Sequence, residues 1–158
     1  MHKVIQMNGN LLAKHAFTII PGNFEFAGNA SSSIKRILKQ MGMEEEFIRR
    51  ICVACYEVEM NMVIYSNGGN VWLNIYPDEI IVIAQDCGPG IPDVGQAMKD
   101  GYSTAPEHVL SQGFGAGRGF SNIKRYTDQF YIDSVLGKGT KLELHFKMPN
   151  TSNIDVNK

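Results

Sequence analysis

Glu57 and Asn61 stand four residues apart in a segment that is otherwise largely apolar. In an α-helix this spacing places both side chains on one stripe, a turn apart. A carboxylate and an amide in apolar surroundings need partners or water, because burying them unpaired is costly. The Asn oxygen suits Mg²⁺ as a hard ligand, and the carboxylate could orient a water or accept a proton. Taken alone, the pair is better explained as a solvent-exposed seam.

A second segment, Asp86-Cys87-Gly88-Pro89-Gly90, directly follows the apolar run Ile80–Ala84. A carboxylate at the end of a buried strand can accept a hydrogen bond from an exocyclic amine, such as that of adenine. The glycines after it would let a planar base approach the backbone closely. A glycine turn with an Asx cap is the simpler interpretation, so this segment alone is only weakly informative.

The third segment is the run Gly113-Phe114-Gly115-Ala116-Gly117-Arg118-Gly119, which leads into a predicted helix. Alternate glycines free successive backbone N–H groups to face phosphate oxygens, and the positive end of a helix favours the same ligand. Arg118 could add a fixed positive charge. A flexible surface loop is the alternative, which the position before a helix disfavours. P-loop and Rossmann fingerprints are both missing from the sequence.

Composition indicates one ordinary globular domain. The chain has 158 residues, of which 44% are hydrophobic and 20% charged, and its formal charge is −1. A net charge so close to zero produces no long-range electrostatic field that would attract nucleic acid or an anionic membrane. The N-terminal residues lack the apolar core of a signal peptide, and the apolar runs are too short to cross a membrane. We therefore expect a cytoplasmic protein with no membrane partner.

The three cysteines are Cys52, Cys55 and Cys87, and the first two form a C-x-x-C. An odd number in a chain without a signal peptide argues against a disulfide framework. Redox chemistry or half of a zinc site is one interpretation of the C-x-x-C. The apolar, helical surroundings and the absence of a second C-x-x-C favour helix packing instead.

The three segments must be positioned by secondary-structure elements, and the sequence predicts both strands and helices between its ends. Strands are predicted at 15–21, 71–76, 79–85, 129–135 and 140–146, with helices at about 29–41, 44–66 and 120–127. Asn29 to Ser33 offer N-caps for the first helix, and Gly42 would end it. The stretch 86–119 is predicted as a long functional loop. This order predicts an α+β two-layer sandwich, with a mixed, mostly antiparallel sheet and helices on one face.

The ends of the chain lack clear periodicity. We expect residues 1–12 to be an N-terminal extension, 13–148 to be the domain, and 149–158 to be a flexible C-terminal tail.

Four segments, taken in order, resemble the asparagine box and the three glycine boxes of the Bergerat-fold (GHKL) ATPases, which include the histidine kinases. Their residues are Glu57-x-x-x-Asn61, Asp86-x-Gly88-x-Gly90, the run 113–119, and Gly139-Thr140 before the last strand. The resemblance covers about residues 15 to 147. Within that superfamily the chain is most similar to small bacterial switch-protein kinases and anti-sigma factors. Residues 86–93 and 98–104 are particularly similar to stressosome-associated serine/threonine kinases.

The resemblance implies a site for ATP and Mg²⁺. Asn61 would ligate the metal, Glu57 would be the catalytic base, and Asp86 would bind the adenine amine with support from Thr140. Residues 94–112 would form a mobile lid. The remaining cofactor-binding residues would be Gly88 and Gly90 beside the base, and Gly113, Gly115, Gly117, Arg118 and Gly119 at the phosphates.

Three features depart from the family pattern. Residues 105–111 look inserted in the lid, Arg118 stands where relatives more often have an apolar residue, and Cys87 follows the adenine-binding Asp86. None of them replaces a residue that the boxes require.

The resemblance further implies phosphoryl transfer to a serine or threonine of a STAS-domain, anti-anti-sigma-type partner in a bacterial transcription switch. A nucleotide-dependent anti-sigma factor that mainly sequesters its partner is the alternative, and the presence of both Glu57 and Asn61 favours the kinase. A detached histidine-kinase domain and a domain without turnover are also open. A sigma factor or a phosphatase could be a further partner, no direct contact with nucleic acid is expected, and a homodimer is left open.

Overall fold

The structure is a computed structural model, which describes residues 9–99 and 119–149. Every predicted strand and helix is present, with ends shifted by at most two residues. A short helix also occurs in the stretch that was predicted to be irregular. The elements are β1 (Ala13–Ile19), α1 (Asn29–Gln40), α2 (Glu45–Tyr65), β2 (Gly69–Ile75), β3 (Glu79–Asp86), α3 (Val94–Ala97), α5 (Gly119–Tyr126), β4 (Gln129–Val135) and β5 (Gly139–Lys147).

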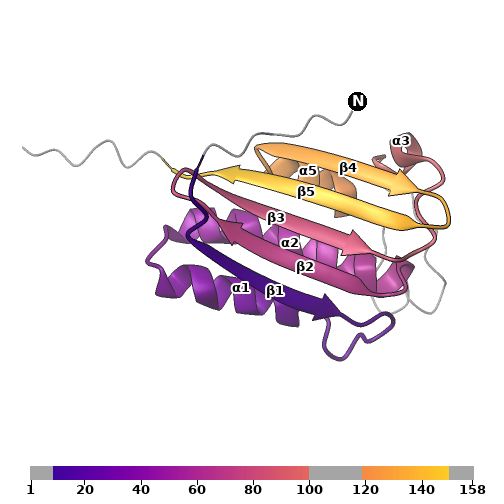
Figure 1. Ribbon diagram of the computed structural model, residues 1–158, viewed down its shortest axis with the longest axis horizontal. Coiled ribbons are helices and arrows are strands. Elements are labelled where there is room, and N and C mark those ends of the chain that lie inside the picture. The colour runs from indigo at the N-terminus through magenta and orange to yellow at the C-terminus, as the bar shows by residue number, and fades with distance from the viewer. Residues whose placement is uncertain (1–8, 100–118, 150–158) are drawn as a thin grey trace, which may run out of the picture.

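The strands form one five-stranded sheet in the order β1-β2-β3-β5-β4, as Figure 1 shows. Each pairing between neighbours is antiparallel. The α+β fold class is confirmed, whereas the prediction of a mixed sheet is wrong for the described strands, because every pair of neighbours is antiparallel. β5 lies between β3 and β4, so the C-terminal strand is interior rather than at an edge.

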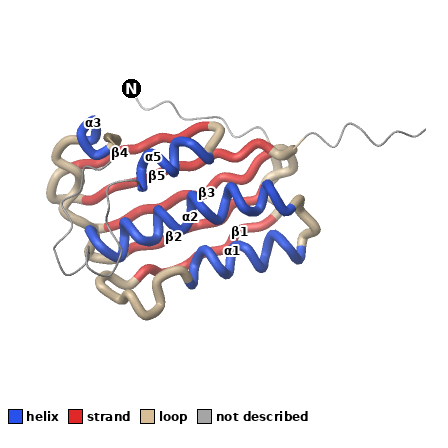
Figure 2. Tube along the Cα trace, turned by 180° about the vertical axis from the view of Figure 1, so that it is seen from behind, coloured by secondary structure: helices blue, strands red, loops and turns tan. Residues whose placement is uncertain are grey.

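Helices α1, α2 and α5 cover one face of the sheet, and Figure 2 shows this helical layer from its own side. The central helix α2 packs against α1 on one flank and α5 on the other. Apolar side chains from both layers are fully buried between them, each contributing about 1.5–3 kcal/mol of transfer free energy. They include Ile34, Leu38, Ile51, Val58, Leu73, Ile75, Ile80, Val82, Ile123, Leu144 and Phe146. The sandwich therefore holds α2 rigidly over the middle of the sheet.

The N-terminus of α1 is capped from outside its own sequence. The N-cap is Gly28, which makes no side-chain cap hydrogen bond, so the predicted local cap by 29–33 is wrong. Glu59 of α2 accepts hydrogen bonds instead from the backbone N–H groups of Gly28, Ala30 and Ser31, at 2.9, 3.1 and 3.0 Å. The helix dipole, which is positive at this end of a helix, also stabilises the carboxylate. The end of α1 agrees with prediction, because Gly42 follows it with φ of 75°.

The loop and tail predictions are only partly tested. α3 occupies four residues within the predicted loop, and residues 100–118 lie outside the described residues, as do 1–8 and 150–158. The predicted lid beyond residue 99 and the inserted-looking 105–111 therefore stay predictions. No helix among the described residues is long and apolar enough to span a membrane.

Candidate functional site

Helix α2 carries Glu57 and Asn61 on the flank that meets the start of α5. Gly119, the first residue of α5, lies so close that an added Cβ would be 3.2 Å from Glu57 Oε2 and 3.3 Å from Asn61 Oδ1. Any side chain at this position would crowd both polar groups. The structure thus brings Glu57 and Asn61 together with the helix start that the sequence assigned to phosphate binding.

Asn122 of α5 fixes one end of the Glu57 carboxylate. Its Nδ2 donates to Glu57 Oε1 at 3.0 Å, which leaves Oε2 directed toward Gly119. Asn122 was not singled out in the sequence, because its partner lies 65 residues away in the chain. One carboxylate oxygen is therefore held while the other faces the start of α5.

Asn61 has an unmet hydrogen-bonding group at this junction. Its Nδ2 is buried and has no partner among the described residues, although buried polar atoms are generally satisfied in native proteins. A bound oxygen acceptor would satisfy the amide, and its Oδ1 is a hard oxygen of the kind that Mg²⁺ prefers. The residues present therefore fit a phosphate group with its metal ion.

Asp86 lies at the end of β3 and is held by two backbone groups. The N–H of Gly88 and the N–H of Thr140 donate to its Oδ1, at 2.8 and 3.0 Å. Within the described part of the chain no hydrogen bond reaches Oδ2. This oxygen is a free acceptor, which suits an exocyclic amine.

Gly88 and Gly90 are required by the protein itself, besides any role beside a base. A Cβ at Gly88 would lie 3.1 Å from Ser66 Cα at the end of α2. Gly90 has φ of 79°, and its Cβ would lie 2.7 Å from Val135 O. The first glycine lets the loop after β3 approach α2, and the second lets it approach β4.

The turn between β4 and β5 packs against Asp86 and the loop that follows it. Gly137 N–H donates to Pro89 O at 2.9 Å. Gly139 has φ of 126° and packs directly on the backbone carbonyl of Asp86. Thr140, predicted to support Asp86, does so through its backbone N–H, while its hydroxyl contacts Ser134 Oγ at 2.9 Å. Ser134 itself was not identified from the sequence.

The predicted residues therefore fall into two groups, joined by α2. One group is Glu57, Asn61 and Gly119, and the other surrounds Asp86. Ser66, which Gly88 approaches, follows Asn61 by five residues, about 7.5 Å along a helix axis. The predicted residues Gly113, Gly115, Gly117 and Arg118 lie outside the described residues.

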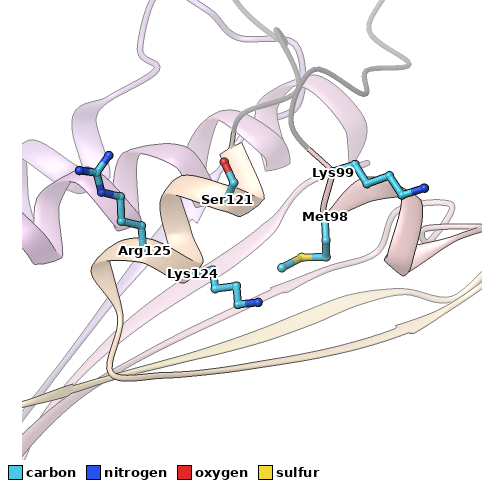
Figure 3. A pocket seen from close by; sticks show the side chains of 5 residues that line it. All are labelled: Met98, Lys99, Ser121, Lys124 and Arg125. Carbon is cyan, nitrogen blue, oxygen red and sulfur yellow. The ribbon is translucent and has the colours of Figure 1, made fainter.

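An open pocket of about 640 Å³ lies on another side of α5, between that helix and the end of α3. Figure 3 shows Met98 and Lys124 pointing toward one another across it. Three of its lining residues are cationic and none of those described is acidic, so it suits an anionic group. Its described lining residues are Met98, Lys99, Ser121, Lys124 and Arg125. None of these described residues is a predicted site residue.

The C-x-x-C packs within the helical layer. Cys55 is buried and Cys52 half-buried, and burial raises the pKa of both thiols. Thiolate is the reactive and metal-binding form, so both thiols are poorly suited to either task. Among the described residues no group of three His, Cys, Asp or Glu side chains could hold a metal ion. The helix-packing interpretation is the one that these observations favour.

Comparison with known proteins places this geometry in a family. The family model described as "Histidine kinase-, DNA gyrase B-, and HSP90-like ATPase" matches residues 47–150. The serine/threonine-protein kinase RsbT of Bacillus subtilis is 32% identical over 113 residues, which are 69% of this chain and 79% of that protein. The anti-sigma F factor of Clostridium novyi is 27% identical over 148 residues, 90% of this chain and 97% of the relative.

Solved structures show the same fold. A chain of the SiaB-SiaC complex from Pseudomonas aeruginosa superposes with a TM-score of 0.59 and 14% identity, covering 86% of this chain and 89% of that one. The mycobacterial sensor histidine kinase MprB gives a TM-score of 0.50 at 14% identity, covering 86% and 98%. Residues 47–150 match this family model, and three of the four predicted boxes lie on α2, at the end of β3 and at the start of β5. The chain therefore belongs to the histidine kinase-, DNA gyrase B- and HSP90-like ATPase family.

Proposed function

We propose that this protein is an ATP-dependent serine/threonine protein kinase, which phosphorylates a STAS-domain partner in a bacterial regulatory switch. The observation that carries the proposal is the junction of α2 and α5, where Glu57 and Asn61 both face the first residue of α5. A phosphate at a helix N-terminus is stabilised by free N–H groups and the helix dipole. A carboxylate and an amide beside that phosphate supply a proton acceptor and a metal ligand.

ATP lies with its base at Asp86 and its phosphates at the start of α5. Asp86 Oδ2 accepts a hydrogen bond from the adenine amine, and Gly88 and Gly90 flank the base. Asn61 Oδ1 would hold Mg²⁺, and the ion would neutralise charge on the phosphates. Gly113, Gly115, Gly117, Arg118 and Gly119 belong to the phosphate-binding segment of this proposal.

Glu57 is the general base. Its Oε1 is held by Asn122, so Oε2 stays oriented toward the phosphate end of the site. Oε2 accepts the proton of the substrate hydroxyl while the hydroxyl oxygen bonds to the γ-phosphorus and the bond to ADP breaks. Phosphoryl transfer depends chiefly on positioning and charge neutralisation, and a well-placed base contributes about 10²–10⁴-fold.

Two relatives support the class of reaction and of partner. RsbT is named a serine/threonine-protein kinase, and it is 32% identical to this chain. A chain of this fold occurs in the SiaB-SiaC complex, so a partner protein is consistent with the architecture. A STAS domain as that partner, a sigma factor or phosphatase as a further one, a cytoplasmic location and a domain spanning 13–148 all belong to the proposal.

A second candidate function is sequestration of a partner under nucleotide control. Relatives named anti-sigma F factor align over as much as 90% of this chain, which favours this function as an accompaniment to phosphorylation. Self-phosphorylation on histidine is disfavoured by the described histidines. His145 is buried with its two ring nitrogens against Glu79 and Glu143, at 3.1 and 2.7 Å, and His15 lies within β1.

Incubation with γ-labelled ATP, Mg²⁺ and a STAS-domain protein encoded beside this chain tests the proposal. We expect label on a serine or threonine of the partner. The variant Glu57→Gln should bind ATP within about threefold of wild type and lose about 10²–10⁴-fold in transfer rate. A stable complex without label would favour sequestration. Undiminished transfer by Glu57→Gln would remove Glu57 as the base.

A further inference from the structure

Ser134 is the point at which two sides of the Asp86 site are joined. It lies near the end of β4 and pairs in register with Thr140 of β5. Its hydroxyl oxygen accepts a hydrogen bond from the backbone N–H of Ile91 at 2.8 Å and contacts the hydroxyl of Thr140 at 2.9 Å. A serine hydroxyl has one proton and two lone pairs, so both hydrogen bonds form together.

The two groups that Ser134 contacts belong to the segments that orient Asp86. Ile91 ends the loop whose Gly88 donates to Asp86 Oδ1, and Thr140 donates to the same oxygen from its backbone. Around Ser134, the loop is further tied to the β4–β5 turn through Gly137 and Pro89. Ser134 supplies the side-chain link between loop and strand.

We propose that Ser134 is a positioning residue for recognition of the nucleotide base. By holding Ile91 and Thr140 together, its hydroxyl keeps Asp86 Oδ2 aimed at the 6-amino group of adenine. The inference rests on the proposed function only in taking ATP as the ligand and Asp86 as the residue that binds its base. Ser134 itself does not touch the base in this proposal, so its loss alters selectivity through Asp86.

Three physical arguments favour this role over plain stabilisation of the sheet. Ser134 is half-buried and lies on the helix-covered side of the sheet, in register with the buried Thr140, whereas its neighbours Asp133 and Val135 are exposed. Its bond to Ile91 N–H spans 43 residues and does not belong to the strand pairing. Removing the hydroxyl leaves that N–H without its acceptor, which is costly where water has poor access. The loop would then shift, and Gly88 with it.

The test compares ATP with inosine triphosphate, which carries an oxygen in place of the 6-amino group. Dissociation constants are measured by calorimetry for wild type, Ser134→Ala, and the pair Ser134→Thr and Ser134→Val. Thr and Val have nearly the same shape and both suit a strand, so they differ chiefly in the hydroxyl. Thr18→Ala is the matched control, because Thr18 also bonds a side chain, Asn70, on the far side of the sheet.

We expect wild type and Ser134→Thr to prefer ATP over inosine triphosphate. Ser134→Ala and Ser134→Val should bind ATP about tenfold more weakly while their affinity for inosine triphosphate changes less than twofold. In the kinase assay the same variants should raise KM for ATP with kcat little changed, which indicates loss of ground-state binding. Thr18→Ala should behave as wild type.

Two outcomes overturn the role of Ser134 alone. In the first, wild type prefers ATP and the variants without the hydroxyl keep that preference. In the second, the variants lose affinity for both nucleotides equally, which a merely structural role would produce. A wild type that binds ATP but does not distinguish it from inosine triphosphate overturns base recognition by Asp86 as well. A wild type that binds neither nucleotide overturns the proposed function itself.

Discussion

Asn122 of α5 and Glu57 of α2 are joined by a hydrogen bond of 3.0 Å between Nδ2 and Oε1. This contact is a polar link between α2 and α5 at the junction where the proposed phosphate end of the site lies. It restricts the rotation of a carboxylate that would otherwise have several rotamers. The geometry of the candidate base is therefore set by a residue of a different helix.

We expect Asn122→Ala to lower kcat for phosphoryl transfer about tenfold, because Glu57 then samples unproductive orientations. KM for ATP should stay within about threefold, since Asn122 is not assigned to the nucleotide. Steady-state kinetics with the protein substrate measures both values. Asn70→Ala, an amide at the opposite face of the sheet, is the control. An unchanged kcat in Asn122→Ala would mean that the hydrogen bond has no part in transfer.

Replacement of Asn61 tests the metal site. Asn61→Ala should remove the difference between ATP affinity measured with Mg²⁺ and with a chelator, because the hard oxygen ligand is gone. Asn61→Asp keeps an oxygen at the same position and should preserve that difference. Calorimetry in the two buffers gives the comparison, and circular dichroism confirms the fold of each variant. Persistent Mg²⁺ dependence in Asn61→Ala would place the metal elsewhere.

Two glycines of the β4–β5 turn should differ sharply when replaced. Gly139 has φ of 126°, and a Cβ there would meet the carbonyl of Asp86, whereas Gly137 has φ of 76° with nothing within 4 Å. Gly139→Ala should lower the free energy of unfolding by about 3 kcal/mol and weaken ATP binding. Gly137→Ala should cost about 1 kcal/mol, the backbone penalty alone. Urea unfolding measures both, and equal losses would contradict the close approach to Asp86.

Replacing Glu59, which caps α1, should lower the free energy of unfolding strongly even though Glu59 does not face the proposed site. Glu59→Ala removes the acceptor for three backbone N–H groups and should cost about 3 kcal/mol of unfolding free energy. Glu59→Gln should cost less, because its amide oxygen still accepts while its NH₂ opposes the Ser31 N–H. The control is Glu46→Ala, an exposed partner of Arg49, which should leave the urea midpoint nearly unchanged. A small loss in Glu59→Ala would show that α1 does not depend on this cap.

Thiol alkylation distinguishes packing cysteines from reactive ones. Burial raises the pKa of the Cys55 and Cys52 thiols, so little thiolate forms at neutral pH. In native protein, iodoacetamide should label the exposed Cys87 first and leave Cys55 unlabelled until urea is added. Mass spectrometry of peptides measures each rate. Fast labelling of Cys55 in the native protein, or formation of a Cys52–Cys55 disulfide under mild oxidation, would support the redox interpretation instead.

Much of the fold followed from local patterns. The run Ile80–Ala84 indicated a buried strand, and four of its five residues are buried in β3. Gly42 correctly marked the end of α1. The pair Glu57 and Asn61 could be placed on one flank of α2 by helix spacing alone, and the structure places both beside Gly119. Each of these inferences depends on residues close together in the chain.

Features that depend on distant partners could not be predicted. Glu59 stands two residues from Glu57 in the same helix, and only the position of α1 gives it a capping role. Gly90 resembles a glycine kept for a ligand, yet it is also required by the carbonyl of Val135. Asn122 and Ser134 are ordinary polar residues until α5 and β4 are packed into place. Tertiary packing decides such roles.

The interior position of β5 has a consequence for synthesis on the ribosome. A nascent chain that has emerged only as far as β4 contains neither the strand that joins β3 to β4 nor Gly139 and Thr140. Its β3 then exposes an unpaired edge, which is a typical target for misassembly and for chaperones. Nucleotide capture through Asp86 must therefore await the emergence of β5, which supplies Thr140 and pairs with β3.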